Sequence, residues 1–578
     1  MIVLFPRPLQ AKGKRLVLIA TAVFLSALPA AEARDDLPGG PAGQVLTREQ
    51  LLADARELAR LLEESHPDPY SGGGGRIAFH RRLHRILSSI PPSGMTRAQF
   101  LRLVQPLVAS VRDGHTQIRL PGNSKCAGPD AWLGWGVVGR GLYVAEVYRP
   151  EDRWLLGSLL ASINGVPFDE LTRRMGEVRG FDNTYNNLVH LAEACTCPPL
   201  LAQLFGTGPL PDPLVFEVLT PDGKTRKFEP EISGSQPGKP VRPETKVPLP
   251  EPNAADMCWT FLDRDGRVAL LRIDSMARYR EAFEVWKSTS YINAVRMHLE
   301  KTFRRATGKE PPNDVDAAIQ SIPSATELLS ELTGAMRSAG TQVLIVDLRK
   351  NRGGNSFMNW IVAFHLFGPS ALPEVAQDEY QIKRYSRLYF ENYGNVSLAE
   401  INRGREVPLQ IGDYDFSEED EYQRRKSGML SGDERRKKEK ELMEYFSRSS
   451  PTFYRALRQA AAPYRPRRIV VLTYAFTYSA GFDLAAMLYK RGAAIVGVPP
   501  SQAGNCYIDT LFFTLTNSRL TGTISHKYSV LFPDDPDAGR VLRPAVELDY
   551  STLRALHLDP NASVLLALDF VEAGAVLP

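Results

Sequence analysis

Two short runs of consecutive apolar residues, at 343–346 and 469–472, constrain the fold of this sequence most strongly. Unbroken apolar runs of this length are typical of strands that are buried on both faces of a sheet. Each run is followed by a turn and then by a helical pattern, which begins near Asn355 in the first case and at Ser479 in the second. A third apolar strand is predicted at 493–498. The order of these segments predicts an α/β core.

Ser479 is placed where a buried strand meets the start of a helix, and functional sites of α/β sheets form at this edge. The free N–H groups and positive dipole end of a helix N-terminus favour negative charge. The backbone N–H of Ala480 could therefore stabilise an oxyanion that forms when Ser479 attacks a carbonyl group. The alternative is that Ser479 only caps its helix, as serines at such positions commonly do.

A glycine pair, Gly353 and Gly354, follows the first apolar strand. Two glycines allow the backbone to turn sharply and to present an N–H group to a ligand. This turn is a candidate second oxyanion donor, and the alternative is an ordinary strand-to-helix turn. It is not a phosphate-binding loop, because no G-x-x-x-x-G-K spacing is present.

A serine nucleophile needs a base, and the chain has nine histidines. His115 differs from the others because it follows an Asp113-Gly114 turn at the end of a predicted helix. Such a turn can hold an imidazole ring out toward a neighbouring domain. The alternative is a polar histidine in a surface loop.

The rest of the chain divides by composition. Capping-box patterns at 47–50 and 96–99 predict amphipathic helices within a small helical domain at 34–125. Short alternating runs predict a β-rich module at 126–232, and the proline-rich segment 233–256 predicts a stiff linker. The α/β core then covers 257–578, with a charged insertion at about 395–455. We expect a solvated helical insertion, with a partner-binding arm as the alternative.

The N-terminus has the pattern of a signal peptide. Basic residues precede an apolar run at 16–30, and Ala31-Glu32-Ala33 resembles a cleavage site. A membrane anchor is the alternative, but this run is shorter than the roughly 20 residues that span a bilayer. We therefore expect cleavage of residues 1–33, no stable membrane insertion afterwards, and a periplasmic or extracellular location.

Charge and cysteine content limit the partners and cofactors. The formal net charge is only +4 and no long tract of one sign occurs, so nucleic acid is not an expected partner. The five cysteines lack metal-ligand spacing. We therefore expect them to form a stray disulfide or to remain free thiols. We expect no metal and no cofactor.

Five motifs together resemble the C-terminal-processing (tail-specific) serine peptidases, and more closely their tricorn-core-like branch. They occur in that family's order over about 400 residues of the chain, although each is weak by itself. The motifs are ESHPDPY at 64–70, DGHT at 113–116, GSLLASING at 157–165, DLR with Asn351 and the glycine pair at 347–354, and TYSA at 477–480.

The resemblance implies a crotonase-like or ClpP-like core of β-β-α units, with a PDZ-like module at 126–232 that binds peptide ends. By position, Ser479 matches the nucleophile, whereas Ala480 and the Gly353-Gly354 turn match the oxyanion donors. The serine-lysine branch has a Gly-Lys pair about 25 residues after the nucleophile, and this chain has Gly504-Asn505 there. The resemblance therefore implies the serine-histidine branch, with His115 as base and a protein or peptide as substrate.

The sequence departs from that pattern at three positions. Gly114 stands where the pattern has a serine before the histidine, and Phe482 stands where it has an acidic residue three positions after the nucleophile. The glutamate expected near the C-terminus is also missing, so Asp537 and Glu547 are the candidates to orient His115, with structural roles as the alternative. A catalytically inactive peptide-binding or scaffold relative is the main rival reading. A non-peptide acyl hydrolase is a third, although the G-x-S-x-G elbow is absent.

Overall fold

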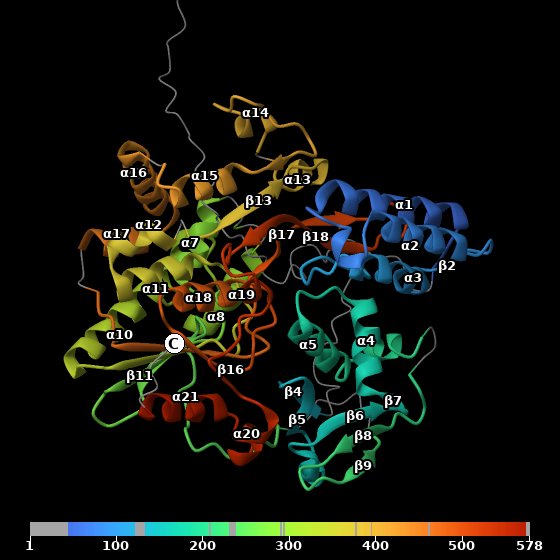
Figure 1. The fold of residues 1–578 in the computed structure, drawn as a ribbon, viewed down its shortest axis with the longest axis horizontal. Coiled ribbons are helices and arrows are strands. Elements are labelled where there is room, and N and C mark those ends of the chain that lie inside the picture. Colours follow the sequence, from blue (N-terminus) through green and yellow to red (C-terminus); the bar gives the residue numbers. More distant parts are fainter. Residues whose placement is uncertain are drawn as a thin grey trace, which may run out of the picture.

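The computed structural model describes residues 44–573 apart from 122–132, 207–209, 231–238, 290–291, 293–294, 376–377, 395, 430 and 460–462. The predicted signal peptide lies outside this part of the chain. Within the described residues, no helix is long and apolar enough to span a bilayer. The fold is mixed α/β with several sheets, as the sequence predicts, and Figure 1 shows the N-terminal helices (blue) and the β-rich module (teal) beside the larger core.

The central sheet of the core has the order β10-β11-β12-β15-β16-β19. Its β10–β11 pair is antiparallel and all its other pairs are parallel. The three apolar runs lie in β12, β15 and β16, so these strand predictions are confirmed, and every residue of β12 is buried. The strands are β10 (Met257–Phe261), β11 (Val268–Ile273), β12 (Val343–Asp347), β15 (Arg468–Thr473), β16 (Ala494–Gly497) and β19 (Val546–Glu547).

Helices cover both faces of this sheet, because side chains of each strand alternate between two apolar clusters. Val343 and Ile345 of β12 pack in the cluster that contains α21, whereas Leu344 and Val346 pack in the cluster that contains α10, α11 and α18. The core helices are α7 (Arg280–Ser288), α8 (Arg296–Thr307), α9 (Val315–Gln320), α10 (Ala325–Ala339), α11 (Phe357–Phe367), α12 (Leu372–Val375), α17 (Pro451–Gln459), α18 (Ala480–Lys490), α19 (Pro536–Arg540), α20 (Tyr550–Ala555) and α21 (Ala562–Glu572).

A second sheet joins the N-terminal helices to the core. Its order is β14-β13-β18-β17, and β3 pairs with the free part of β18. The charged insertion follows β13 and is helical, as predicted. The elements are β3 (Gln117–Arg119), β13 (Tyr380–Arg384), β14 (Tyr414–Asp415), β17 (Asn505–Thr514), β18 (Thr521–Val530), α13 (Arg387–Asn392), α14 (Leu398–Ile401), α15 (Ser417–Lys426) and α16 (Gly432–Ser449).

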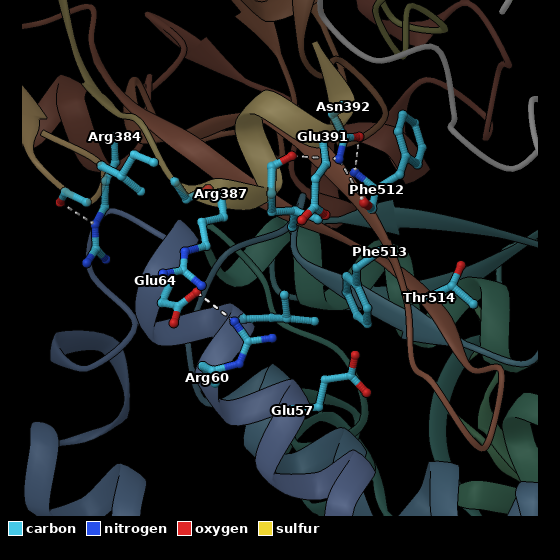
Figure 2. Close-up of a pocket in the computed structure, with 15 residues that line it drawn as sticks. Glu57, Arg60, Glu64, Arg384, Arg387, Glu391, Asn392, Phe512, Phe513 and Thr514 are labelled. Atoms are coloured by element: carbon cyan, nitrogen blue, oxygen red, sulfur yellow. Dashed lines mark hydrogen bonds and ion pairs between the residues drawn. The ribbon is translucent and has the colours of Figure 1, made fainter. Parts of the chain in front are cut away.

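Both predicted capping boxes are present in the N-terminal helical segment, at Thr47 and Thr96. These helices enclose an apolar cluster that extends to Leu511 and Ile524 of the second sheet, so the segment packs directly on the core. Figure 2 shows a pocket at this contact, which is lined by α1 and by the end of β17. The elements are β1 (Val45–Leu46), α1 (Arg48–Ser65), α2 (Arg76–Ser89), β2 (Met95–Thr96) and α3 (Arg97–Ala109).

The β-rich module contains a sheet with the order β4-β5-β6-β8-β9, and β7 pairs with β6. It also contains three helices that the alternating sequence pattern did not reveal. The elements are β4 (Leu133–Val138), β5 (Gly141–Val147), β6 (Leu159–Ile163), β7 (Val166–Pro167), α4 (Phe168–Val178), α5 (Thr184–Ala194), α6 (Pro198–Gln203), β8 (Phe216–Leu219) and β9 (Thr225–Phe228).

A buried carboxylate on α1 binds the turn between β17 and β18. Asp54 accepts hydrogen bonds from the backbone N–H groups of Asn517 and Ser518, and from the side chain of Asn517.

We predict that Asp54→Ala lowers the free energy of unfolding by about 2–4 kcal/mol, because it leaves buried donors without an acceptor. Chemical denaturation measures this change, with Asp420→Ala on the exposed face of α15 as the control. Equal losses in both variants would contradict the prediction.

Candidate active site

Ser479 occupies the sharp turn between β15 and α18, where it is the N-cap residue of the helix. Its φ of 52° and ψ of −132° lie in a region that side-chain-bearing residues rarely adopt, and such backbone strain costs about 1–3 kcal/mol. The Ser479 N–H group donates a hydrogen bond of 2.6 Å to Oε1 of the buried Gln502 side chain. The side chain of Ser479 makes no cap hydrogen bond, so the simple capping alternative does not describe it.

The glycine turn lies directly against Ser479. A Cβ atom at Gly353 would lie 2.6 Å from Cβ of Ser479, and one at Gly354 would lie 2.2 Å from the backbone of Met276. Their φ angles are 105° and 140°, which also disfavour any other residue. The glycine pair is therefore required by close approach of the backbone, and the turn is not an ordinary one.

The two glycine amides face different partners. Gly353 N–H donates to Oδ1 of Asn351 at 2.9 Å. The residues on either side of Gly354 both bond to Met276: the carbonyl of Gly353 accepts Met276 N–H, and Asn355 N–H donates to the carbonyl of Met276. Because backbone N–H groups alternate in direction along an extended segment, the N–H group of Gly354 faces away from Met276. Among the described residues, the N–H groups of Gly354 and Ala480 have no hydrogen-bond acceptor. Of the predicted oxyanion donors, Gly354 and Ala480 are thus free, whereas Gly353 is already engaged.

His115 lies in the loop between α3 and β3, and this loop is attached to β18. The Thr523 hydroxyl donates to the carbonyl of His115 at 2.7 Å, and Ser525 N–H donates to the Thr116 hydroxyl. His115 Nδ1 lies 3.2 Å from the hydroxyl of Tyr478, which immediately precedes Ser479. Folding therefore brings the predicted base into contact with the residue that precedes the predicted nucleophile. No hydrogen bond joins the side chains of His115 and Ser479 in the part of the chain that the structure describes.

Two carboxylates lie beside His115, and sequence reasoning assigned a role to neither. Asp113 accepts the His115 backbone N–H at 2.8 Å, and its Oδ1 lies 3.8 Å from His115 Nδ1. Burial opposes the ionisation of Asp113, but the hydrogen bond and charge of His66 hold the pKa of this carboxyl below its ordinary value. Asp113 therefore places a negative charge beside the ring of His115.

The second carboxylate, Asp182, comes from the segment that precedes α5. It accepts Gly114 N–H at 2.8 Å and the Tyr478 hydroxyl at 2.9 Å. Burial raises the pKa of Asp182 to about 6, against the opposing charge of His115. The ligand atoms of Asp113, Asp182 and His115 lie within 4.8 Å of one another, a spacing that a metal ion could use. Protein donors already occupy both carboxylates, so the arrangement suits proton sharing.

The two acidic residues predicted to orient His115 lie elsewhere. Asp537 is on α19, where it is exposed and closest to Arg540, and Glu547 is on the edge strand β19 near Tyr185. No hydrogen bond or ion pair joins either residue to His115 within the described chain. The carboxylates that lie beside His115 are instead those of Asp113 and Asp182.

A further buried carboxyl, that of Asp483, belongs to α18 itself. Asp483 is four residues after Ser479, one position beyond the place where the resembled pattern has an acid. Its Oδ2 accepts the Ser356 hydroxyl at 2.8 Å, which connects α18 to the loop that follows the glycine turn. Burial, and then the charge of Glu379, raise the pKa of Asp483 to about 8.

One cysteine thiol, that of the buried Cys506, lies near Asp182 and Tyr478. Cys195, Cys258 and Cys506 carry free thiols, and Cys197 is disulfide-bonded.

We predict that Asp483→Asn removes a pH-dependent loss of stability. The folded-state pKa is about 8 and the ordinary value about 4, so the wild type loses stability as pH rises from about 4 to 8, by up to about 1.4 kcal/mol per pH unit. The variant should therefore gain stability relative to the wild type across this range. Denaturation curves at pH 5, 6 and 7 measure the gain, and parallel pH dependence of the two proteins would contradict it.

Comparison with known proteins identifies a family for part of the chain. No curated protein sequence matches the chain significantly. Among solved structures, a CPAF point mutant is 13% identical with a TM-score of 0.50, and covers 92% of this chain and 99% of its own. Mature CPAF is 12% identical with a TM-score of 0.48 and the same coverage. The photosystem II D1 C-terminal processing protease is 14% identical with a TM-score of 0.36, covering 88% and 94%.

The similarity to the CPAF point mutant supports the multidomain α/β fold. The model of peptidase family S41 matches residues 317–530, a segment that contains the glycine turn and Ser479 but not His115. The chain therefore carries a domain of peptidase family S41, the family of the C-terminal-processing peptidases.

Proposed function

We propose that this protein is an exported serine endopeptidase in which Ser479 is the nucleophile and His115 is the general base. One observation carries the proposal: the loop of His115 is hydrogen-bonded to Tyr478, the residue before a strained serine that has a glycine turn packed against it. These segments are more than 350 residues apart in the sequence. The S41 family match supports a peptidase, and the geometry supports this assignment of its residues.

The reaction is acyl transfer to the serine. His115 takes the proton of the Ser479 hydroxyl, Oγ bonds to the carbonyl carbon of a peptide, and the carbonyl oxygen becomes an oxyanion. The proton then passes from His115 to the leaving amine as the peptide bond breaks. Water, activated by the same histidine, attacks the acyl enzyme and releases the carboxylic acid and the free serine.

The free amides of Gly354 and Ala480 are the proposed oxyanion donors. Ala480 N–H is at the N-terminus of α18, where the helix dipole adds positive potential. The hydrogen bond from Ser479 N–H to Gln502 helps to fix the strained backbone, so the donors need no rearrangement during the reaction. Loss of one such donor typically lowers kcat by a factor of about 100 to 1000.

The substrate is proposed to be a protein or peptide, consistent with the family. The β-rich module lies next to the site through α5, and a PDZ-like role in binding peptide ends remains part of this proposal. Export to the periplasm or the cell exterior, after removal of residues 1–33, rests on the pattern of the N-terminal sequence alone.

The experiment is labelling with a fluorophosphonate, followed by assay of an unfolded protein substrate. We predict that wild type is labelled at Ser479 and cleaves the substrate, whereas Ser479→Ala is not labelled and loses at least about a thousandfold in kcat. Ser110→Ala is the matched control, because Ser110 is equally buried, at 9% exposure, and donates to the carbonyl of Leu107.

A folded wild type that neither reacts nor cleaves would overturn the peptidase proposal and favour the catalytically inactive peptide binder. Labelling of both wild type and Ser479→Ala would place the nucleophile at another residue. Labelling at Ser479 without cleavage of any peptide bond, but with ester hydrolysis, would favour a non-peptide acyl hydrolase.

A further inference from the structure

We infer that Tyr478 and Asp182 are positioning residues that hold His115 in the tautomer a general base requires, through the hydrogen-bonded series Asp182, Tyr478 hydroxyl, His115 Nδ1. This inference rests on the proposed function, because it assigns a role to His115 as the base. It concerns the protonation of one ring, however, which can be measured without any catalytic turnover.

The direction of the two hydrogen bonds determines the tautomer. The Tyr478 hydroxyl donates its proton to Oδ2 of Asp182 at 2.9 Å. Its oxygen can then only accept from His115 Nδ1, which lies 3.2 Å away, so Nδ1 carries the ring proton. The lone pair is thereby placed on Nε2, which is the atom left to take the proton of Ser479. The two rings lie with their centroids 4.9 Å apart, which further limits rotation of the imidazole.

Asp182 is itself held in place by backbone contacts. Its Oδ1 accepts Gly114 N–H at 2.8 Å, and its own N–H donates to Oδ1 of Asn186 at 3.3 Å. The next residue, Asn183, caps α5 and donates its side-chain amide to the carbonyl of Pro500. One oxygen of the Asp182 carboxylate thus accepts a hydrogen bond from the loop of His115, and the other accepts one from the hydroxyl of Tyr478.

Asp113 does not fill the same role. Its Oδ1 already accepts the backbone N–H of His115 and is 3.8 Å from Nδ1, beyond hydrogen-bond distance. Its Oδ2 accepts the Thr116 hydroxyl and lies 3.3 Å from Nε2 of His66. Asp113 therefore supplies negative charge near the ring, whereas Tyr478 supplies the acceptor.

The glycine at position 114 fits this arrangement. A Cβ atom on Gly114 would lie 2.4 Å from the hydroxyl oxygen of Tyr478 and 3.1 Å from Oδ1 of Asp182. The phenol oxygen, together with Oδ1 of Asn186 at 2.7 Å from the same Cβ position, thus occupies the space that a side chain at 114 would need. The resembled peptidase pattern has a serine at this position, so a tyrosine hydroxyl from the nucleophile loop stands where that serine hydroxyl would be. At position 114, where the sequence departs from the resembled peptidase pattern, the hydroxyl of Tyr478 thus replaces the hydroxyl of the serine.

The first experiment compares Tyr478→Phe with Tyr474→Phe. Tyr474 is in the same loop, and its hydroxyl accepts a hydrogen bond from Val137 N–H, so the control also loses a tyrosine hydroxyl. We expect Tyr478→Phe to lower kcat at least about tenfold at nearly constant KM, whereas Tyr474→Phe keeps kcat within a factor of about two. Asp182→Asn should lower kcat in the same sense, and it replaces Tyr478→Phe as the test if that variant does not fold.

The second experiment reads the tautomer directly by 15N NMR of protein labelled at histidine, with His115→Asn to identify the signals. We expect the Nδ1–H tautomer in wild type and in Tyr474→Phe, and a mixture or the Nε2–H tautomer in Tyr478→Phe.

The outcomes separate this inference from the proposed function. An unchanged His115 tautomer and unchanged kcat in Tyr478→Phe would overturn the inference even if Ser479 proves to be the nucleophile. If wild type is inactive, the proposed function fails, yet a tautomer that depends on the Tyr478 hydroxyl would still support the positioning role.

Discussion

The site depends on a single carboxylate, Asp182, which binds two segments that the sequence places far apart. One oxygen accepts Gly114 N–H and the other accepts the Tyr478 hydroxyl, so the loop of His115 and the loop of Ser479 are held by the same carboxylate. The helix that follows, α5, also contacts the glycine turn through the ion pair of Glu193 with Arg352. Because these contacts are formed by one short stretch of the β-rich module, the position of the module determines the geometry of the site.

Buried polar groups around Ser479 fix a backbone that would otherwise relax. The serine is held at positive φ by the hydrogen bond to Gln502 on one side and by contact with Gly353 on the other. Asn351 contributes further, since its side chain accepts Gly353 N–H and its carbonyl accepts Tyr478 N–H. A strained backbone conformation of this kind persists only where several surrounding contacts hold it in place, and the contacts with Gln502, Gly353 and Asn351 do so here. The free amides of Gly354 and Ala480 are a consequence of the same constraints.

The sequence predicted the elements whose signals are local. Buried strands, helix starts and both capping boxes follow from periodicity and cap chemistry, and the glycine pair and Ser479 occur at strand ends where the structure places the site. The sequence did not predict Asp182, Tyr478 or Asp483 as site residues, because an isolated tyrosine or aspartate becomes significant only through its tertiary neighbours. The helices of the β-rich module were also missed. In α5 the polar residues Asn186, Asn187 and His190 are buried together with the apolar ones, so its sequence does not show which face packs inward. Asp537 and Glu547 were chosen by their order in the chain, which says little about distance in the fold.

The most direct test of the account is a crystal structure of the protein after reaction with a fluorophosphonate. We predict a phosphonyl group on Ser479 Oγ, with its oxygen within hydrogen-bond distance of the N–H groups of Gly354 and Ala480, and with His115 Nε2 facing the same adduct while Nδ1 remains on Tyr478. An adduct on another residue, or a phosphonyl oxygen bound elsewhere with His115 turned away from Ser479, would contradict it.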